Sequence, residues 1–141
     1  MPPIKMKHVV DPRDAILNAV GTLNYMTLAA NQVLVAVYKR PEETAGGIIM
    51  TSQTRDEDHY QSKVGLVLAI GPTAFTIDPH AADPDPWGFE NLNVDVHDWV
   101  VFRPSDGWAL DLYDMSGEKV RCRMLQDVSI RAKILEPDQV W

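Results

Sequence analysis

Three consecutive large apolar residues lie within a long polar stretch of the chain. They are Ile48, Ile49 and Met50, and they follow the pair Gly46 and Gly47. Two glycines leave the backbone free to change conformation, and the polar flanks keep the segment in water when nothing is bound. The chemistry that this pattern favours is hydrophobic capture by an apolar groove of a partner. A further strand of a sheet is the alternative interpretation of the same residues.

Free-energy estimates indicate that one such segment binds weakly by itself. Burial of three aliphatic side chains contributes about 4.5 to 9 kcal/mol. Ordering of about seven backbone residues costs about 7 to 14 kcal/mol. Useful affinity therefore requires several copies presented together, because later copies bind at a high effective concentration. This favours a symmetric oligomer, whereas a monomer would indicate a small acidic binding module.

The other residues with reactive or metal-binding side chains do not form a known constellation. The four histidines are scattered along the chain: His8, His59, His80 and His97. None of them has the spacing of a metal-binding pair. Asp78, Asp83 and Asp85 lack a calcium-loop signature, so a solvated surface is favoured over a Ca²⁺ site. The motifs of nucleophilic catalysis, phosphate binding and dinucleotide binding are also missing, and we expect no enzyme activity, no metal and no cofactor.

Composition and charge narrow the class of protein. The 141 residues are 45% hydrophobic and 23% charged, as in a single globular domain. Thirteen basic residues against 20 acidic ones give a net charge of −7, which argues against nucleic-acid binding because that requires clustered Lys and Arg. No run approaches the roughly 20 apolar residues that span a bilayer, so we expect no membrane span. Asp11, Arg13 and Asp14 interrupt what would have to be an apolar signal core, so we expect a cytoplasmic protein. Cys122 stands alone, which excludes an intramolecular disulfide, and we expect it to be a packing residue.

Short apolar runs separated by turn residues predict an all-β barrel or sandwich. The six runs are 32–38, 64–70, 99–102, 108–113, 119–125 and 128–135. The first run is apolar on both faces, so we expect it to be covered on both sides. Asp106-Gly107 and Ser116-Gly117 have the composition of tight turns and predict a meander over the last third of the chain. The last run alternates, which predicts one buried face: Val128, Ile130, Ala132 and Ile134.

The start of the chain contains the signals of a short helix. Asp11 is a suitable N-cap, Pro12 fits the first helical position, and Asp14 favours the positive end of the helix dipole. Gly21 is a natural stop. Three apolar residues fall on one helical face, which we expect to pack onto a larger body: Ile16, Leu17 and Val20.

Two stretches are longer than ordinary connections between strands. The first, 41–63, contains the apolar triplet. The second, 71–98, contains Pro72, Pro79, Pro84 and Pro86, which break regular strand pairing. We expect an elaborated loop or an irregular hairpin there.

Several segments resemble, in order and approximate spacing, the GroES-type co-chaperonins. They are Asn-Gln-Val-Leu-Val-Ala-Val-Tyr-Lys at 31–39, Thr-Ala-Gly-Gly-Ile-Ile-Met at 44–50, a strand ending in Ala-Ile-Gly-Pro at 63–72, Val-His-Asp-Trp-Val-Val-Phe at 96–102, and Asp-Gly-Trp at 106–108. The most specific is 44–50, because the mobile loop of this family carries a Gly-Gly pair followed by an aliphatic triplet. The resemblance covers residues 31–135.

The resemblance implies a small β-barrel subunit of a heptameric ring that caps a GroEL-type chaperonin during ATP-driven folding of a client protein. Gly46 and Gly47 would supply loop mobility, and Ile48, Ile49 and Met50 would insert into grooves of the chaperonin, which itself binds the ATP. Trp108 falls where the family has an aromatic facing the enclosed chamber. The strand at 128–135 would form the contact between subunits.

The chain departs from the family pattern at its N-terminus and in the second long stretch. Residues 1–30 form an extension before the barrel of 31–135, with a mobile loop at 41–63, a roof loop at 71–98 and a tail at 136–141. His97 stands where family members carry a turn glycine, and a left-handed histidine there would be strained. These departures favour a phage-encoded co-chaperonin, in the host cytoplasm, with a capsid protein as client. The alternative is a structural protein of a phage virion that reuses the barrel.

Overall fold

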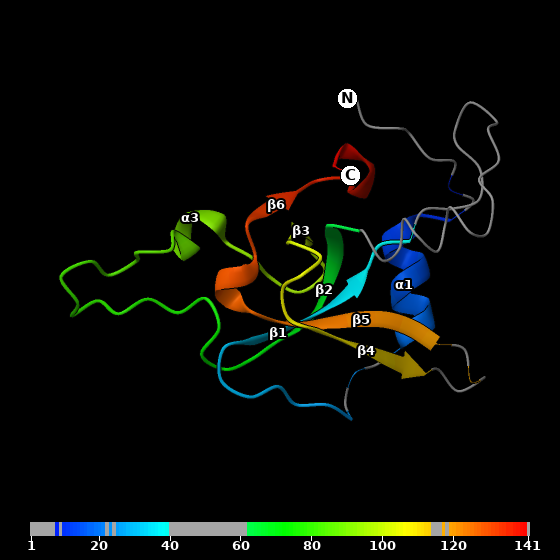
Figure 1. Cartoon of the computed structure of the whole chain (residues 1–141), viewed down its shortest axis with the longest axis horizontal. Coiled ribbons are helices and arrows are strands. Elements are labelled where there is room, and N and C mark those ends of the chain that lie inside the picture. The colour runs from blue at the N-terminus through cyan, green and yellow to red at the C-terminus, as the bar shows by residue number, and fades with distance from the viewer. Residues whose placement is uncertain are drawn as a thin grey trace.

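Six strands form one antiparallel sheet in the computed structural model of the chain (Figure 1). The structure describes residues 8, 10–21, 23, 25–39, 62–113, 117 and 119–140. The strands are β1 (Gln32–Val37), β2 (Val64–Ile70), β3 (Trp99–Val101), β4 (Trp108–Tyr113), β5 (Lys119–Gln126) and β6 (Ala132–Ile134). Helical structure in the described residues is confined to α1 (Pro12–Val20), α3 (Phe89–Leu92) and two 3₁₀ turns, η1 (Asp127–Ser129) and η2 (Pro137–Gln139). The predicted all-β class is confirmed.

The order of the strands is β4-β5-β1-β2-β3-β6, and within the described residues β4 does not pair with β6. Strand pairing therefore leaves the sheet unclosed, and its six strands are consistent with the small GroES-like all-β fold that we expected. The predicted hairpin of β4 and β5 is confirmed, with Tyr113 opposite Lys119. The predicted meander is wrong for β3, which pairs with β2 and β6. Burial explains the difference: Trp99 and Val100 are buried and need neighbours on both sides, whereas Trp108 and Tyr113 are exposed and tolerate an edge.

The apolar side chains of β1 point alternately to the two faces of the sheet, and both faces are covered, as the sequence predicts. One face packs against α1 and the segment that follows it, and its buried members include Val20, Leu28, Leu34, Ala36, Tyr38, Leu66, Trp99 and Cys122. The other face packs against the start of the 71–98 segment, and its buried members include Val33, Val35, Val37, Val67, Ala74, Val100, Phe102 and Leu125. The residues before β1 thus complete one half of the core.

The predicted helix forms with the predicted cap. The side chain of Asp11 accepts hydrogen bonds from the backbone N–H groups of Arg13 and Asp14, at 2.9 and 3.3 Å. The helix ends at Gly21, whose φ is 70°. Val20 is buried, and Ile16 and Leu17 pack beside it on the core. Figure 1 shows α1 lying beside β5.

The last predicted strand is too long, because only Ala132–Ile134 pair in the sheet. The chain turns at η1, where the Asp127 carboxylate accepts a hydrogen bond from the N–H of Val128 at 2.7 Å. The Asp127 carbonyl accepts another from the N–H of Ile130 at 3.1 Å. These local bonds stabilise a turn in place of an extended strand. Val128 and Ile130 consequently lie before β6.

The segment 71–98 projects from the sheet as an irregular loop that carries α3 (Figure 1). At its start, Gly71 approaches the backbone so closely that a Cβ atom would lie 2.3 Å from the Ala30 carbonyl oxygen. At its end, His97 adopts the left-handed conformation with a φ of 70°. The N–H of His97 donates to the Val67 carbonyl at 2.7 Å, which holds the turn against β2. The turn at which the resemblance implies a glycine is therefore made here with histidine.

Candidate functional site

The predicted binding segment connects two strands that are neighbours in the sheet. The N–H of Tyr38, just after β1, donates to the carbonyl of Val64 at 2.9 Å. Ser62, just before β2, is 2% exposed, and its hydroxyl lies 3.3 Å from the same carbonyl. Gly46, Gly47, Ile48, Ile49 and Met50 lie outside the described residues. The described residues at the two ends of their connection, Tyr38 and Ser62, therefore lie next to each other at the sheet.

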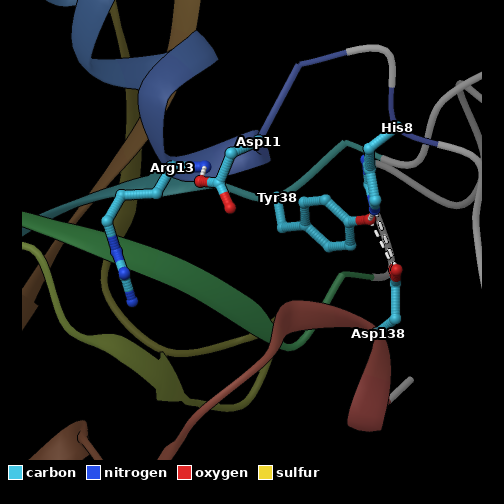
Figure 2. A network of polar contacts seen from close by, with 5 residues as sticks. All are labelled: His8, Asp11, Arg13, Tyr38 and Asp138. Atoms are coloured by element: carbon cyan, nitrogen blue, oxygen red, sulfur yellow. Dashed lines mark hydrogen bonds and ion pairs between the residues drawn. The ribbon is translucent and has the colours of Figure 1, made fainter.

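A cluster of polar side chains surrounds the start of this connection (Figure 2). Tyr38 is 1% exposed, and its ring lies edge-on against Trp99, with centroids 5.6 Å apart. Its hydroxyl lies 2.5 Å from Asp138 Oδ1 and 3.2 Å from His8 Nε2. Sequence reasoning missed this cluster, because the participants are 30 and 100 residues from Tyr38 and no spacing signals them.

Trp108 is 58% exposed on the edge strand β4. The turn before it is rigid: Gly107 has a φ of 67°, and a Cβ atom there would lie 2.1 Å from the Met124 carbonyl oxygen. The guanidinium of Arg123 donates to the Asp106 carbonyl through Nε at 3.0 Å and also through Nη2. Burial lowers the pKa of Arg123, and the negative charge of Asp106 opposes that shift. Strand and turn together present the indole to solvent.

The described residues hold no group of three or more His, Cys, Asp or Glu side chains arranged to bind a metal ion. Asp85 instead accepts the backbone N–H groups of Phe89 and Glu90, at 2.8 and 2.9 Å, at the start of α3. Asp78 accepts the N–H of His80 at 3.0 Å. Cys122 is fully buried, as predicted for a packing residue. Burial, followed by the nearby charge of Asp111, raises the pKa of its thiol to about 12, which leaves it unreactive near neutral pH.

None of the helices in the described part of the chain has the length and apolar character needed to span a membrane.

The family model of the chaperonin 10 Kd subunit matches residues 25–134, which is well over half of the chain. The chain belongs to the chaperonin 10 Kd subunit family. No curated protein matches it. Members of this family are co-chaperonins, which are oligomeric and act as partners of GroEL-type chaperonins, and this is the general function of the chain. The resemblance inferred from the sequence motifs is confirmed.

In this co-chaperonin the predicted subunit-contact residues differ in burial. Ile130 is 5% exposed and belongs to the core of its own subunit. The other three predicted residues are half-buried: Val128, Ala132 and Ile134. Leu135, directly after β6, is 82% exposed. Sequence reasoning did not single it out, although an apolar residue that breaks the alternation of the strand is a signal for an exposed contact.

The family match also divides the polar cluster at Tyr38. Tyr38 lies inside residues 25–134, whereas His8 and Asp138 lie outside them on opposite sides. In this co-chaperonin, the Tyr38 hydroxyl therefore belongs to the part of the chain that the family model matches. Its two partners, His8 and Asp138, come from the segments before and after that part.

Proposed function

We propose that the chain caps a GroEL-type chaperonin as a subunit of a heptameric ring and assists ATP-dependent folding of a client protein. Ile48, Ile49 and Met50 insert into apolar grooves of the chaperonin, and Gly46 and Gly47 let the segment adapt. ATP binds to the chaperonin. The observation that carries the proposal is the family match over 25–134, which includes the Gly-Gly and aliphatic triplet between β1 and β2.

The free-energy estimates support a ring. A single triplet gains about as much from burial as ordering of its backbone costs, so binding requires several subunits that present their segments together. We propose that β6 and the residues on either side of it form part of the contact between subunits, through Val128, Ala132, Ile134 and the exposed Leu135. Trp108, exposed on β4, is proposed to face the enclosed chamber.

The proposal places the protein in the cytoplasm, where a GroEL-type chaperonin is found. A phage source and a capsid client remain predictions, based on the N-terminal extension and the proline-rich segment 71–98. Stoichiometric presence in purified virions, together with no chaperonin binding, would instead support the virion role.

The decisive experiment compares Ile49→Asp with Gln53→Asp, which introduces the same charge on a polar flank of the same segment. We expect wild type and Gln53→Asp to co-sediment with a GroEL-type chaperonin in ADP, and Ile49→Asp to lose binding because a carboxylate is costly in an apolar groove. Tryptophan fluorescence checks that both variants are folded, and native mass spectrometry gives the ring size. Undiminished binding of Ile49→Asp would refute the proposed contact.

A further inference from the structure

We propose that His8 and Asp138 form a clasp over Tyr38 that fixes the start of the chaperonin-binding segment. In this role they are positioning residues for chaperonin binding, and the inference rests on the function proposed above. The clasp consists of His8, Tyr38 and Asp138, and Figure 2 shows the three side chains converging on the Tyr38 hydroxyl. Residues near both ends of the chain would then contribute to chaperonin binding, which segment 41–63 is proposed to make.

The geometry determines where the protons of the clasp lie. His8 Nε2 is 2.8 Å from Asp138 Oδ2, and the Tyr38 hydroxyl is 2.5 Å from Asp138 Oδ1. A carboxylate only accepts hydrogen bonds, so the tyrosine O–H and the histidine Nε2–H must both donate to it. Each oxygen of Asp138 thus has its own donor. The hydroxyl, on a ring that is 1% exposed, has the partner that a buried tyrosine requires.

The tail presents Asp138 from a rigid turn. Pro137 is fully buried. The Gln139 side chain accepts the backbone N–H of Glu136 at 3.0 Å, and the Gln139 N–H donates to the Glu136 carbonyl at 3.2 Å. Asp138 lies between these residues, so the bonded turn restrains its backbone next to Tyr38.

The other partner comes from the N-terminal extension, three residues before the Asp11 cap of α1. The ring of His8 packs at a tilt beside that of Tyr38, with centroids 6.2 Å apart. The helix that follows His8 packs on the core through Val20, with Ile16 and Leu17 beside it. In Figure 2 the side chain of Arg13 points away from the clasp, whereas that of His8 points toward the Tyr38 hydroxyl.

The clasp acts at the point where the binding segment starts. The backbone N–H of Tyr38 pairs with the Val64 carbonyl at 2.9 Å, and the Lys63 carbonyl accepts the N–H of Phe102 at 2.9 Å. The first bond holds the two ends of the segment together, and the second ties the far end to Phe102, just after β3. The clasp adds a restraint on the first end through the Tyr38 side chain. A segment with fixed ends loses less conformational entropy when it binds. In a ring the gain is repeated in every subunit.

The test removes one oxygen atom from the clasp. Tyr38→Phe keeps the ring against Trp99 but leaves Asp138 without its tyrosine donor, and Tyr113→Phe makes the same change on a side chain that is 65% exposed. We expect amide exchange at Tyr38 and Val64 to accelerate about tenfold in Tyr38→Phe, which corresponds to 1.4 kcal/mol. We expect affinity for a GroEL-type chaperonin in ADP to fall at least about threefold. Tyr113→Phe should match wild type in both measurements.

A second pair of variants separates positioning from general stability. His8→Ala removes the donor, whereas His8→Gln retains an N–H₂ group able to reach Asp138. We expect the glutamine variant to recover most of the affinity for the chaperonin that the alanine variant loses. The free energy of unfolding should be the same in the two variants. Wild-type affinity in both Tyr38→Phe and His8→Ala would overturn the clasp and leave the proposed function intact. A wild-type protein that binds no chaperonin would overturn the proposed function and the positioning role with it, and unchanged amide exchange would refute the clasp as a restraint.

Discussion

The carboxylate of Asp127 accepts a hydrogen bond from the backbone N–H of Phe75 at 3.1 Å, although 52 residues separate the two. Phe75 is in the left-handed conformation, with a φ of 58°, which is strained for a bulky side chain. Its ring packs edge-on against Phe89, with centroids 5.4 Å apart. The hydrogen bond and the ring contact hold the strained residue in place, and they anchor the base of the 71–98 loop to the turn before β6.

Asp127→Asn is therefore expected to loosen this loop. The Asp127 carboxylate is 5% exposed and accepts the Asn31 side-chain N–H₂, the Phe75 N–H and the Val128 N–H. Both oxygens of the carboxylate accept hydrogen bonds, but the asparagine side chain has only one oxygen. At least one of the three N–H donors would therefore face the new NH₂ group, which should lower the free energy of unfolding by about 1 to 3 kcal/mol. Urea unfolding measures the loss, and faster amide exchange at Phe75 locates it. Asp83→Asn, at an exposed position of the same loop, should leave both unchanged.

Gly107→Ala should destabilise the protein more than Gly117→Ala does. Both glycines have a positive φ, 67° and 87°, so each substitution carries a conformational cost of about 1 to 2 kcal/mol. At Gly107 the new Cβ would also lie 2.1 Å from the Met124 carbonyl oxygen, whereas at Gly117 it meets no atom within 4 Å. The clash should add about 1 to 3 kcal/mol. Equal free energies of unfolding for the two variants would contradict the close packing at Gly107.

Stability is expected to fall in alkali because of Cys122. Its pKa is raised from 9.0 to about 12 by burial, so between these values the unfolded chain has lost a proton that the folded chain retains. The stabilisation is complete below about pH 9 and is lost as pH rises toward 12, by up to about 1.4 kcal/mol per pH unit. Urea unfolding from pH 7 to 10.5 gives the slope. Cys122→Ala should flatten it, and an equal slope in both proteins would assign the alkaline loss to other groups.

Asp11→Ala should weaken the attachment of the N-terminal extension. It removes the acceptor of the Arg13 and Asp14 N–H groups at the start of α1, at a cost of about 0.5 to 2 kcal/mol. Amide exchange in residues 13–20 should accelerate, since the first turn is no longer capped. Asp11→Ser retains a capping oxygen and should stay close to wild type. Identical exchange in the alanine and serine variants would argue against the cap.

The sequence alone determined the features that depend on neighbouring residues. The α1 helix is predictable because Asp11, Pro12 and Gly21 act on groups a few positions away, and most of the strands are predictable from the spacing of apolar residues. The Gly-Gly pair and aliphatic triplet at 46–50 are also neighbours in the sequence, and they indicated the co-chaperonin family.

Only the tertiary structure decided which strands are neighbours and which distant side chains meet. β3 lies between β2 and β6 because Trp99 and Val100 require burial on both sides, whereas β4, with exposed Trp108 and Tyr113, lies at an edge. The clasp at Tyr38 joins residues up to 130 positions apart, and the bond from Phe75 to Asp127 spans 52. Such contacts leave no periodicity in the sequence, because their geometry arises only when the packed core brings separate segments together.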